Sequence, residues 1–142
     1  MAETRKRCPV VINFSTGAVG LSREQRIGHI VATRPPIAAL NMGSMNYAKY
    51  SSKRKEFVFQ FVFANPFEEI VFYLSRMTEA GVRPELECFD SGHIASLEPL
   101  IDMGLLRPPY DVNLVMGVMG GMRATAEVLT FMVGQLPEGA VR

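Results

Sequence analysis

The sequence predicts an α/β fold built on a parallel sheet. Four short, largely apolar runs have the composition of buried parallel strands, and each is followed by a segment with helical signals. The predicted strands are Val10–Ser15, Ile37–Met42, Glu85–Phe89 and Val112–Val118. Strands that alternate with helices in this way form βαβ units, in which neighbouring strands run parallel.

A helix is predicted after each strand, at 22–33, 65–81, 94–103 and 123–136. Ser22 and Gln25 form a capping box at the start of the first helix. Asn65-Pro66 predicts an N-cap followed by proline at the first helical position of the second. Pro99 predicts a kink or a late start in the third helix.

The segment between the second strand and the second helix is ambiguous. Phenylalanines alternate with other residues in Phe57–Phe63, which is the period of a strand. It is either an extra edge strand or an extended approach to the next helix that packs on the outside of the sheet, and we favour the second. The polar and basic segment Tyr47–Glu56 is predicted to be an exposed loop.

Composition predicts a single globular domain over residues 1–142, with 48% hydrophobic and 20% charged residues. A net charge of +1 provides no electrostatic basis for nucleic-acid binding. The longest apolar stretch is far shorter than the ~20 residues of a membrane helix, so no membrane partner is predicted. Cys8 and Cys88 form neither a disulfide framework nor a metal-binding pair, which favours a cytoplasmic location and a buried free thiol at Cys88.

Polar and glycine residues gather at the C-terminal ends of the predicted strands. Ser15, Thr16 and Gly17 follow the first strand, Asn41 ends the second, and Glu87 lies near the end of the third. Parallel α/β architectures bind their ligands at the carboxyl ends of the strands. We therefore expect these strand ends to form one shared site.

The turn formed by Ser15, Thr16, Gly17 and Ala18 has two interpretations. Its hydroxyls and backbone amides suit a substrate carboxylate or carbonyl. An ordinary Ser/Thr turn, however, uses the same groups to satisfy its own backbone.

Glu85 and Glu87 lie two residues apart and therefore face the same way on a strand. A carboxylate inside an α/β core is costly unless it is paired or used, so Glu87 is a candidate catalytic base or orienting group. The alternative is that Glu85 lies at the rim and Glu87 is a structural salt-bridge partner.

Two further features have weaker signals. Gly120-Gly121 is expected to open a helix, where free amides attract a phosphate or carboxylate, although a tight turn is the alternative. His29 and His93 have no other ligand at metal-binding spacing, so both are predicted to be surface or packing residues.

Four motifs, in order and spread over nearly the whole chain, resemble the β-keto acid cleavage enzymes. They are NFSTGAVG at 13–20, AALNMGSMNY at 38–47, PELECFDSG at 84–92 and GVMGGM at 117–122. The resemblance implies a (β/α)8 TIM barrel with a catalytic zinc. It also implies an enzyme that condenses a β-keto acid with acetyl-CoA to give acetoacetate and a new acyl-CoA.

The expected fold is then a partial barrel of about four consecutive βα units, resembling strands three to six. By resemblance, Ser15 and the backbone of Gly17 and Ala18 hold substrate, and Glu87 faces the reacting centre. Ala39 stands where relatives carry Ser or Thr. The implied zinc ligands, a His-x-His pair and a late Glu, are absent from this sequence, so no metal ligand is predicted here.

Three hypotheses follow. The first is an enzyme of this kind, with missing strands supplied by a longer polypeptide or by a second chain. The second is a non-catalytic half barrel without the metal site. Open sheet edges lead us to expect a homo-oligomer in either case. The third is an independent α/β module that binds anions.

Overall fold

The structure is a computed structural model that describes residues 2–141. Its strands are β1 (Asn13–Ser15), β2 (Ile37–Asn41), β3 (Met45–Ser51), β4 (Glu56–Phe63), β5 (Arg83–Cys88), β6 (Tyr110–Leu114) and β7 (Ala140–Val141). Its helices are α1 (Ala2–Arg7), α2 (Arg23–Thr33), α3 (Phe67–Ala80), α4 (Ser91–Ala95), α5 (Leu97–Asp102) and α6 (Ala126–Gly134). No helix in this described part is long and apolar enough to cross a membrane.

Five strands form one sheet in the order β1-β2-β5-β6-β7, and every neighbouring pair is parallel. The prediction of a parallel α/β sheet is confirmed, although the first predicted strand is shortened to β1 and the last is shifted toward the N-terminus, to Tyr110–Leu114 in β6. The two-residue strand β7 was not predicted. Each later strand joins the sheet at the same edge, so the chain builds the sheet in one direction.

The two faces of the sheet differ in polarity. Ala38, Leu40, Leu86 and Cys88 point to one face and are almost fully buried in a core that all of the helices from α2 to α6 share. Alternate residues point the other way, and these are largely polar: Asn13, Ser15, Ala39, Asn41, Glu85, Glu87, Asp111 and Asn113. Since side chains alternate along a strand, the polar face carries every predicted strand residue of the site.

The helix caps follow the sequence in part. Ser22 and Gln25 exchange both hydrogen bonds of the predicted capping box, at 3.3 and 2.9 Å. The predicted cap at Asn65 is wrong by one residue, because Pro66 occupies the N-cap position of α3. The third predicted helix is divided between α4 and α5, and Pro99 lies in the first turn of α5, which confirms a break at this place.

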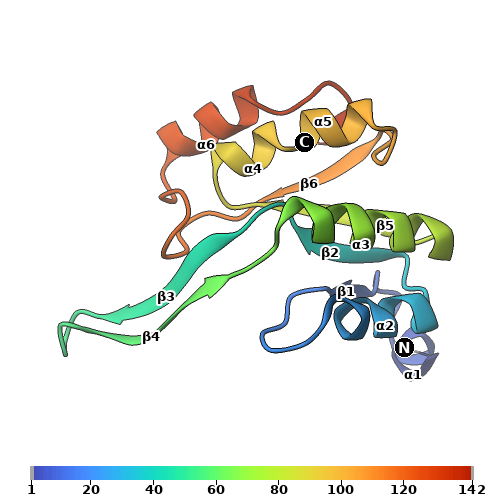
Figure 1. The fold of residues 1–142 in the computed structure, drawn as a ribbon, viewed down its shortest axis with the longest axis horizontal. Helices are drawn as coiled ribbons and strands as arrows, with labels where there is room; N and C mark the ends of the chain where they lie inside the picture. The colour runs from blue at the N-terminus through green and yellow to red at the C-terminus, as the bar shows by residue number, and fades with distance from the viewer. Residues whose placement is uncertain (1, 142) are drawn as a thin grey trace.

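The β3–β4 hairpin is the main correction to the predicted fold. Tyr47–Glu56 is not a loop, because most of it forms β3 and the turn that follows. Phe57–Phe63 belongs to β4, which pairs antiparallel with β3 and has a bulge after Lys49. The extended approach that packs outside the sheet is therefore wrong. The hairpin projects away from the rest of the molecule (Figure 1).

Gly120 and Gly121 close a tight turn and do not open a helix, because α6 begins only at Ala126. The amide of Gly121 donates to the carbonyl of Val118 at 3.0 Å. A Cβ on Gly120 would collide with the carbonyl oxygen of Asn46 in β3, and the φ of Gly120 is +98°. Glycine is needed here because the turn lies directly against the hairpin.

Replacing Gly120 with Ala is expected to lower the free energy of unfolding by about 2 kcal/mol, from steric collision and a strained backbone. Gly28→Ala is the matched control, because Gly28 lies inside α2 with no atom near its missing Cβ. The control should raise stability by about 0.5–1 kcal/mol. Chemical denaturation of both variants measures the difference, and equal effects would contradict the close approach.

Candidate active site

A pocket of about 270 Å³ lies where the carboxyl ends of β1, β2 and β5 meet the base of the hairpin. It is lined by Gly17, Ala18, Val19, Asn41, Met45, Tyr47, Phe61, Phe63, Glu87 and Phe89. The strand ends supply its polar groups, and the hairpin supplies most of an apolar wall. The arrangement places one carboxylate among mainly apolar side chains.

Four predicted site residues, Gly17, Ala18, Asn41 and Glu87, line this pocket together. Ser15 and Thr16 do not belong to the lining. The hydroxyl of Ser15 accepts a hydrogen bond from the Gly17 amide at 2.9 Å. The hydroxyl of Thr16 is buried and donates to the carbonyl of Ala39 at 3.0 Å. In this structure the turn satisfies its own backbone, and substrate binding by its hydroxyls stays a prediction.

Glu87 is half-buried and is the acidic residue of the pocket. Burial, with a smaller contribution from the negative charge of Glu85, raises the pKa of Glu87 above its ordinary value. Within residues 2–141 no cation forms an ion pair with Glu87, so the structural salt-bridge alternative finds no support. Glu85 accepts a hydrogen bond from the amide of Asn13 at 2.7 Å. A carboxyl with a raised pKa holds its proton more readily than an ordinary carboxyl, which suits general acid–base chemistry.

Asn41 is buried beside Glu87, and the two residues are register partners on β2 and β5. The side-chain oxygen of Asn41 accepts a hydrogen bond from the Gly43 amide at 3.1 Å. Its backbone carbonyl accepts another from the side-chain amide of Asn65. These contacts hold the end of β2, so Asn41 is anchored at the pocket wall.

Arg26 is a buried residue beside the pocket that the sequence analysis did not single out. It is 5% exposed and donates to the carbonyl of Thr16 at 2.9 Å, to the side chain of Asn65 at 2.9 Å and to Glu69 at 2.7 Å. Its guanidinium also lies 5.7 Å from the ring centre of Phe63, which lines the pocket. Helical spacing places Arg26 on the same side of α2 as Ile30, four residues later. This spacing was the one sequence signal that Arg26 would be buried.

The two histidines and Cys88 do not line the Glu87 pocket. His93 is buried, and its Nδ1 accepts from the Phe89 amide at 3.3 Å, while His29 packs near the ring of Phe14. Cys88 is a buried free thiol, as predicted, and burial raises the pKa of Cys88 to about 12. No group of three His, Cys, Asp or Glu residues within the described chain is placed to hold a metal ion.

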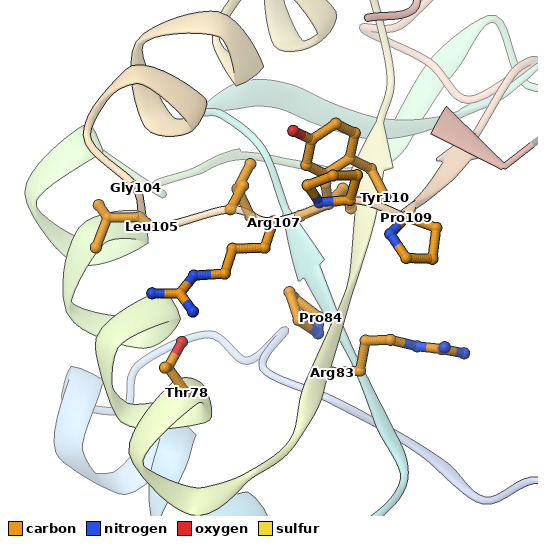
Figure 2. Close-up of a pocket in the computed structure, with 11 residues that line it drawn as sticks. Thr78, Arg83, Pro84, Gly104, Leu105, Arg107, Pro109 and Tyr110 are labelled. Carbon is orange, nitrogen blue, oxygen red and sulfur yellow. The ribbon is translucent and has the colours of Figure 1, made fainter. Parts of the chain in front are cut away.

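A second pocket, of about 300 Å³, lies at the opposite end of the sheet, beside the start of β5 and β6. Arg83 and Arg107 line it, but Figure 2 shows their side chains extending in different directions. Arg83 is held by Asp111 at 2.6 Å. Because the two cations do not converge, this pocket presents no built anion site. The functional candidate is the pocket at the carboxyl ends.

Fold and site thus define an α/β protein with a carboxylate-bearing pocket at the carboxyl ends of parallel strands. The sequence matches the beta-keto acid cleavage enzyme family over residues 1–142, and the chain belongs to that family.

Curated relatives include a 3,5-dioxohexanoate:acetyl-CoA acetone transferase from Paraburkholderia graminis, which is 34% identical over 90% of this chain and 46% of its own length. A 3-keto-5-aminohexanoate cleavage enzyme from Acetoanaerobium sticklandii is 33% identical over 94% of this chain and 45% of its own length. The chain therefore spans just under half the length of these relatives.

Among solved structures, the chain is similar to ObcA in a binary complex with oxaloacetate. The TM-score is 0.60 with 23% sequence identity, over 80% of this chain and 24% of that chain. The apo structure of ObcA has a TM-score of 0.59. At this identity the likeness concerns the fold alone.

Arg26→Met is expected to lower the free energy of unfolding by about 3–5 kcal/mol, since it leaves Glu69, Asn65 and the Thr16 carbonyl without their partner. Arg76→Met removes an exposed arginine that pairs with Glu79 at 2.6 Å, and it should cost no more than about 0.5 kcal/mol. Thermal and urea unfolding compare the two variants. Similar losses would contradict a central role for Arg26.

The raised pKa of Glu87 makes stability depend on pH. An acid whose pKa is higher in the folded state stabilises the protein fully below its unfolded pKa, and this contribution is lost as pH rises through the folded pKa. Glu87→Gln should therefore flatten the decline in unfolding free energy that the wild type shows above about pH 4.5. Denaturation at several pH values from 4 to 8 measures this.

Glu85→Gln provides an independent check on the cause. It removes the neighbouring charge and keeps an oxygen for Asn13, so the pKa of Glu87 should fall but stay above its ordinary value. Carboxyl NMR titration reports this pKa directly. An unchanged decline in Glu87→Gln, or a Glu87 pKa at or below its ordinary value in the wild type, would refute the assignment.

Proposed function

We propose that this chain is part of a (β/α)8 barrel that condenses a β-keto acid with acetyl-CoA to give acetoacetate and a new acyl-CoA. Support for the barrel comes from the parallel strands, each added at the same edge, and from helices that share the core on one face. The four units that begin with β1, β2, β5 and β6 would correspond to strands three to six of the barrel. The activity rests on family membership and on relatives named for acetyl-CoA-dependent transfer.

The observation that carries the proposal is the position of Glu87. It lies in a mainly apolar pocket with Asn41, Gly17 and Ala18, and burial holds its pKa above the ordinary value. Under the proposal the keto acid occupies this pocket, and Glu87 takes or orients a proton at the reacting carbon. The Ala18 amide donates no hydrogen bond within the described chain, so it is available to a substrate oxygen.

Ala39 lies on the polar face of β2, two residues before the pocket residue Asn41. It pairs with Ser15 and Glu85 across the sheet and is 5% exposed, and its methyl group donates no hydrogen bond. The family resemblance implies a Ser or Thr at this position. We therefore propose a substrate whose recognised end is less polar there than the substrates of enzymes with that hydroxyl.

The zinc implied by the family resemblance does not fit residues 2–141, which gather no set of three ligands. Its ligands would come from a further part of the polypeptide or from a second chain. Every role assigned above belongs to residues of this chain. A homo-oligomeric, cytoplasmic enzyme is the form that we propose.

A non-catalytic half barrel that oligomerises is the second candidate, favoured by exposed apolar side chains on the hairpin such as Phe57, Phe59 and Val62. The independent anion-binding module, which requires the chain to close its own compact core, is less supported, because Gly120-Gly121 does not open a helix whose amides could bind an anion. Catalysis by the full chain separates the first two candidates.

Acetoacetate formation tests the proposal. The full-length protein is incubated with acetyl-CoA and a panel of β-keto acids, and acetoacetate and the new thioesters are identified by mass spectrometry. Glu87→Gln should lower kcat about 10²–10⁴-fold, as expected for loss of a positioned base. Glu79→Gln, on the exposed face of α3, is the control and should keep wild-type rates. Full activity in Glu87→Gln, or no turnover of any keto acid by the wild type, would refute the proposal.

A further inference from the structure

We propose that the β3–β4 hairpin is the docking arm for the acyl-CoA substrate, with the thioester end in the Glu87 pocket and the phosphates at the hairpin tip. This inference rests on the proposed function. It assigns a recognition role to a segment that the family match leaves without one, and it is argued from the shape, the apolar surface and the charge of the hairpin.

The base of the hairpin forms part of the pocket. Met45 and Phe63 are register partners at the base, and Tyr47 and Phe61 are partners one step further along the same face. All four line the pocket that contains Glu87. A ligand bound beside Glu87 therefore lies against the hairpin from the start.

A second hollow, of about 420 Å³, lies against the other face of the hairpin. Its lining includes Asn46, Ala48, Gln60 and Val62, which alternate with the pocket residues along the two strands, and the turn at Gly120 lies on its rim. A ligand arm that leaves the Glu87 pocket toward the hairpin tip therefore follows the face that carries Tyr47 and Phe61.

Aromatic side chains continue along this face of the hairpin beyond the pocket. Tyr47 stacks near Phe59, with ring centres 6.1 Å apart, and Phe59 stacks near Phe61 at 6.2 Å. Phe59 is 43% exposed. Exposed aromatic residues in one row mark a binding surface, and this row extends from the pocket toward the hairpin tip.

The tip of the hairpin is basic. This part of the chain has one acidic residue, Glu56, and four cationic residues, Lys49, Lys53, Arg54 and Lys55. Within residues 2–141 only Arg54 of these four has an acidic partner, Glu56 at 3.2 Å. The whole chain has a net charge of only +1, so this positive charge is a local feature. Clustered cations at an exposed tip attract phosphate groups.

The order of these features matches the order of groups in an acyl-CoA. The molecule has a reactive thioester at one end, a long amide-containing arm in the middle and a phosphorylated nucleotide at the other end. The protein presents a reactive carboxylate, an aromatic row and then a basic tip. Strand β3 has seven residues and a length of about 23 Å, so the two ends are well separated.

Calorimetric titration of the full chain with CoA, dephospho-CoA and pantetheine tests this arrangement. Replacing Lys53, Arg54 and Lys55 with Gln should raise the Kd for CoA roughly tenfold or more and leave that for pantetheine unchanged. The matched control replaces three exposed cations elsewhere, Lys6, Arg7 and Arg107, and should change the Kd for CoA less than about twofold. Phe59→Ser should weaken pantetheine and CoA alike.

Three outcomes would contradict the docking role of the hairpin. They are no CoA binding by the wild type, an equal loss of CoA affinity in the control variant, or an unchanged Kd for CoA in the tip variant. Light scattering tests a competing role for the hairpin. If the tip variant forms an assembly of different molecular mass from the wild type while its affinity for CoA is unchanged, the hairpin is a contact between copies and the inference fails. Tip-dependent CoA binding without acetoacetate formation would support the arm and refute the proposed reaction, so the two failures are distinguishable.

Discussion

The buried guanidinium of Arg26 connects the separate parts of the pocket. It joins the turn after β1, through the Thr16 carbonyl, to the start of α3, through Asn65 and Glu69. Asn65 in turn donates from its side chain to the carbonyl of Asn41 at the end of β2, and its backbone amide donates to the Ser44 hydroxyl at 2.8 Å. Three loops that follow three different strands are thereby fixed to one cation. Without that cation, each loop would have to be positioned by its own short-range contacts.

The two-faced sheet explains why the polar groups collect where they do. Apolar side chains of β2 and β5 face the helices and form the core, so the polar side chains between them must face the other way. Parallel pairing then aligns Asn41 with Glu87 and brings the ends of the strands to one edge. Burial and the neighbouring Glu85 raise the pKa of Glu87, and both follow from strand order and alternation.

Local signals predicted the parallel strands, the capping box at Ser22 and the meeting of Gly17, Ala18, Asn41 and Glu87, because each depends on alternation or on adjacent residues. They failed where distant residues decide. Lys53 to Lys55 lie in the turn between β3 and β4, yet their charge obscured the strand period of the residues before them. Gly120 and Gly121 have the composition of a helix start, but contact with Asn46 and Phe89 gives them another role. The hydrogen-bond partners of Arg26 lie 10, 39 and 43 positions away in the sequence, so no local pattern could predict them.

The hairpin also has a consequence for how the family can diversify. Both of its ends leave the body at paired residues, Met45 and Phe63, which lie about 5 Å apart in such a pair. A segment with adjacent ends behaves as a cassette: it can be shortened, lengthened or exchanged while the strand ends beneath it keep their places. Under the proposed roles, recognition of a ligand's remote portion and transformation of its reactive portion would be encoded in separable stretches of the gene, and selection could alter one without disturbing the other.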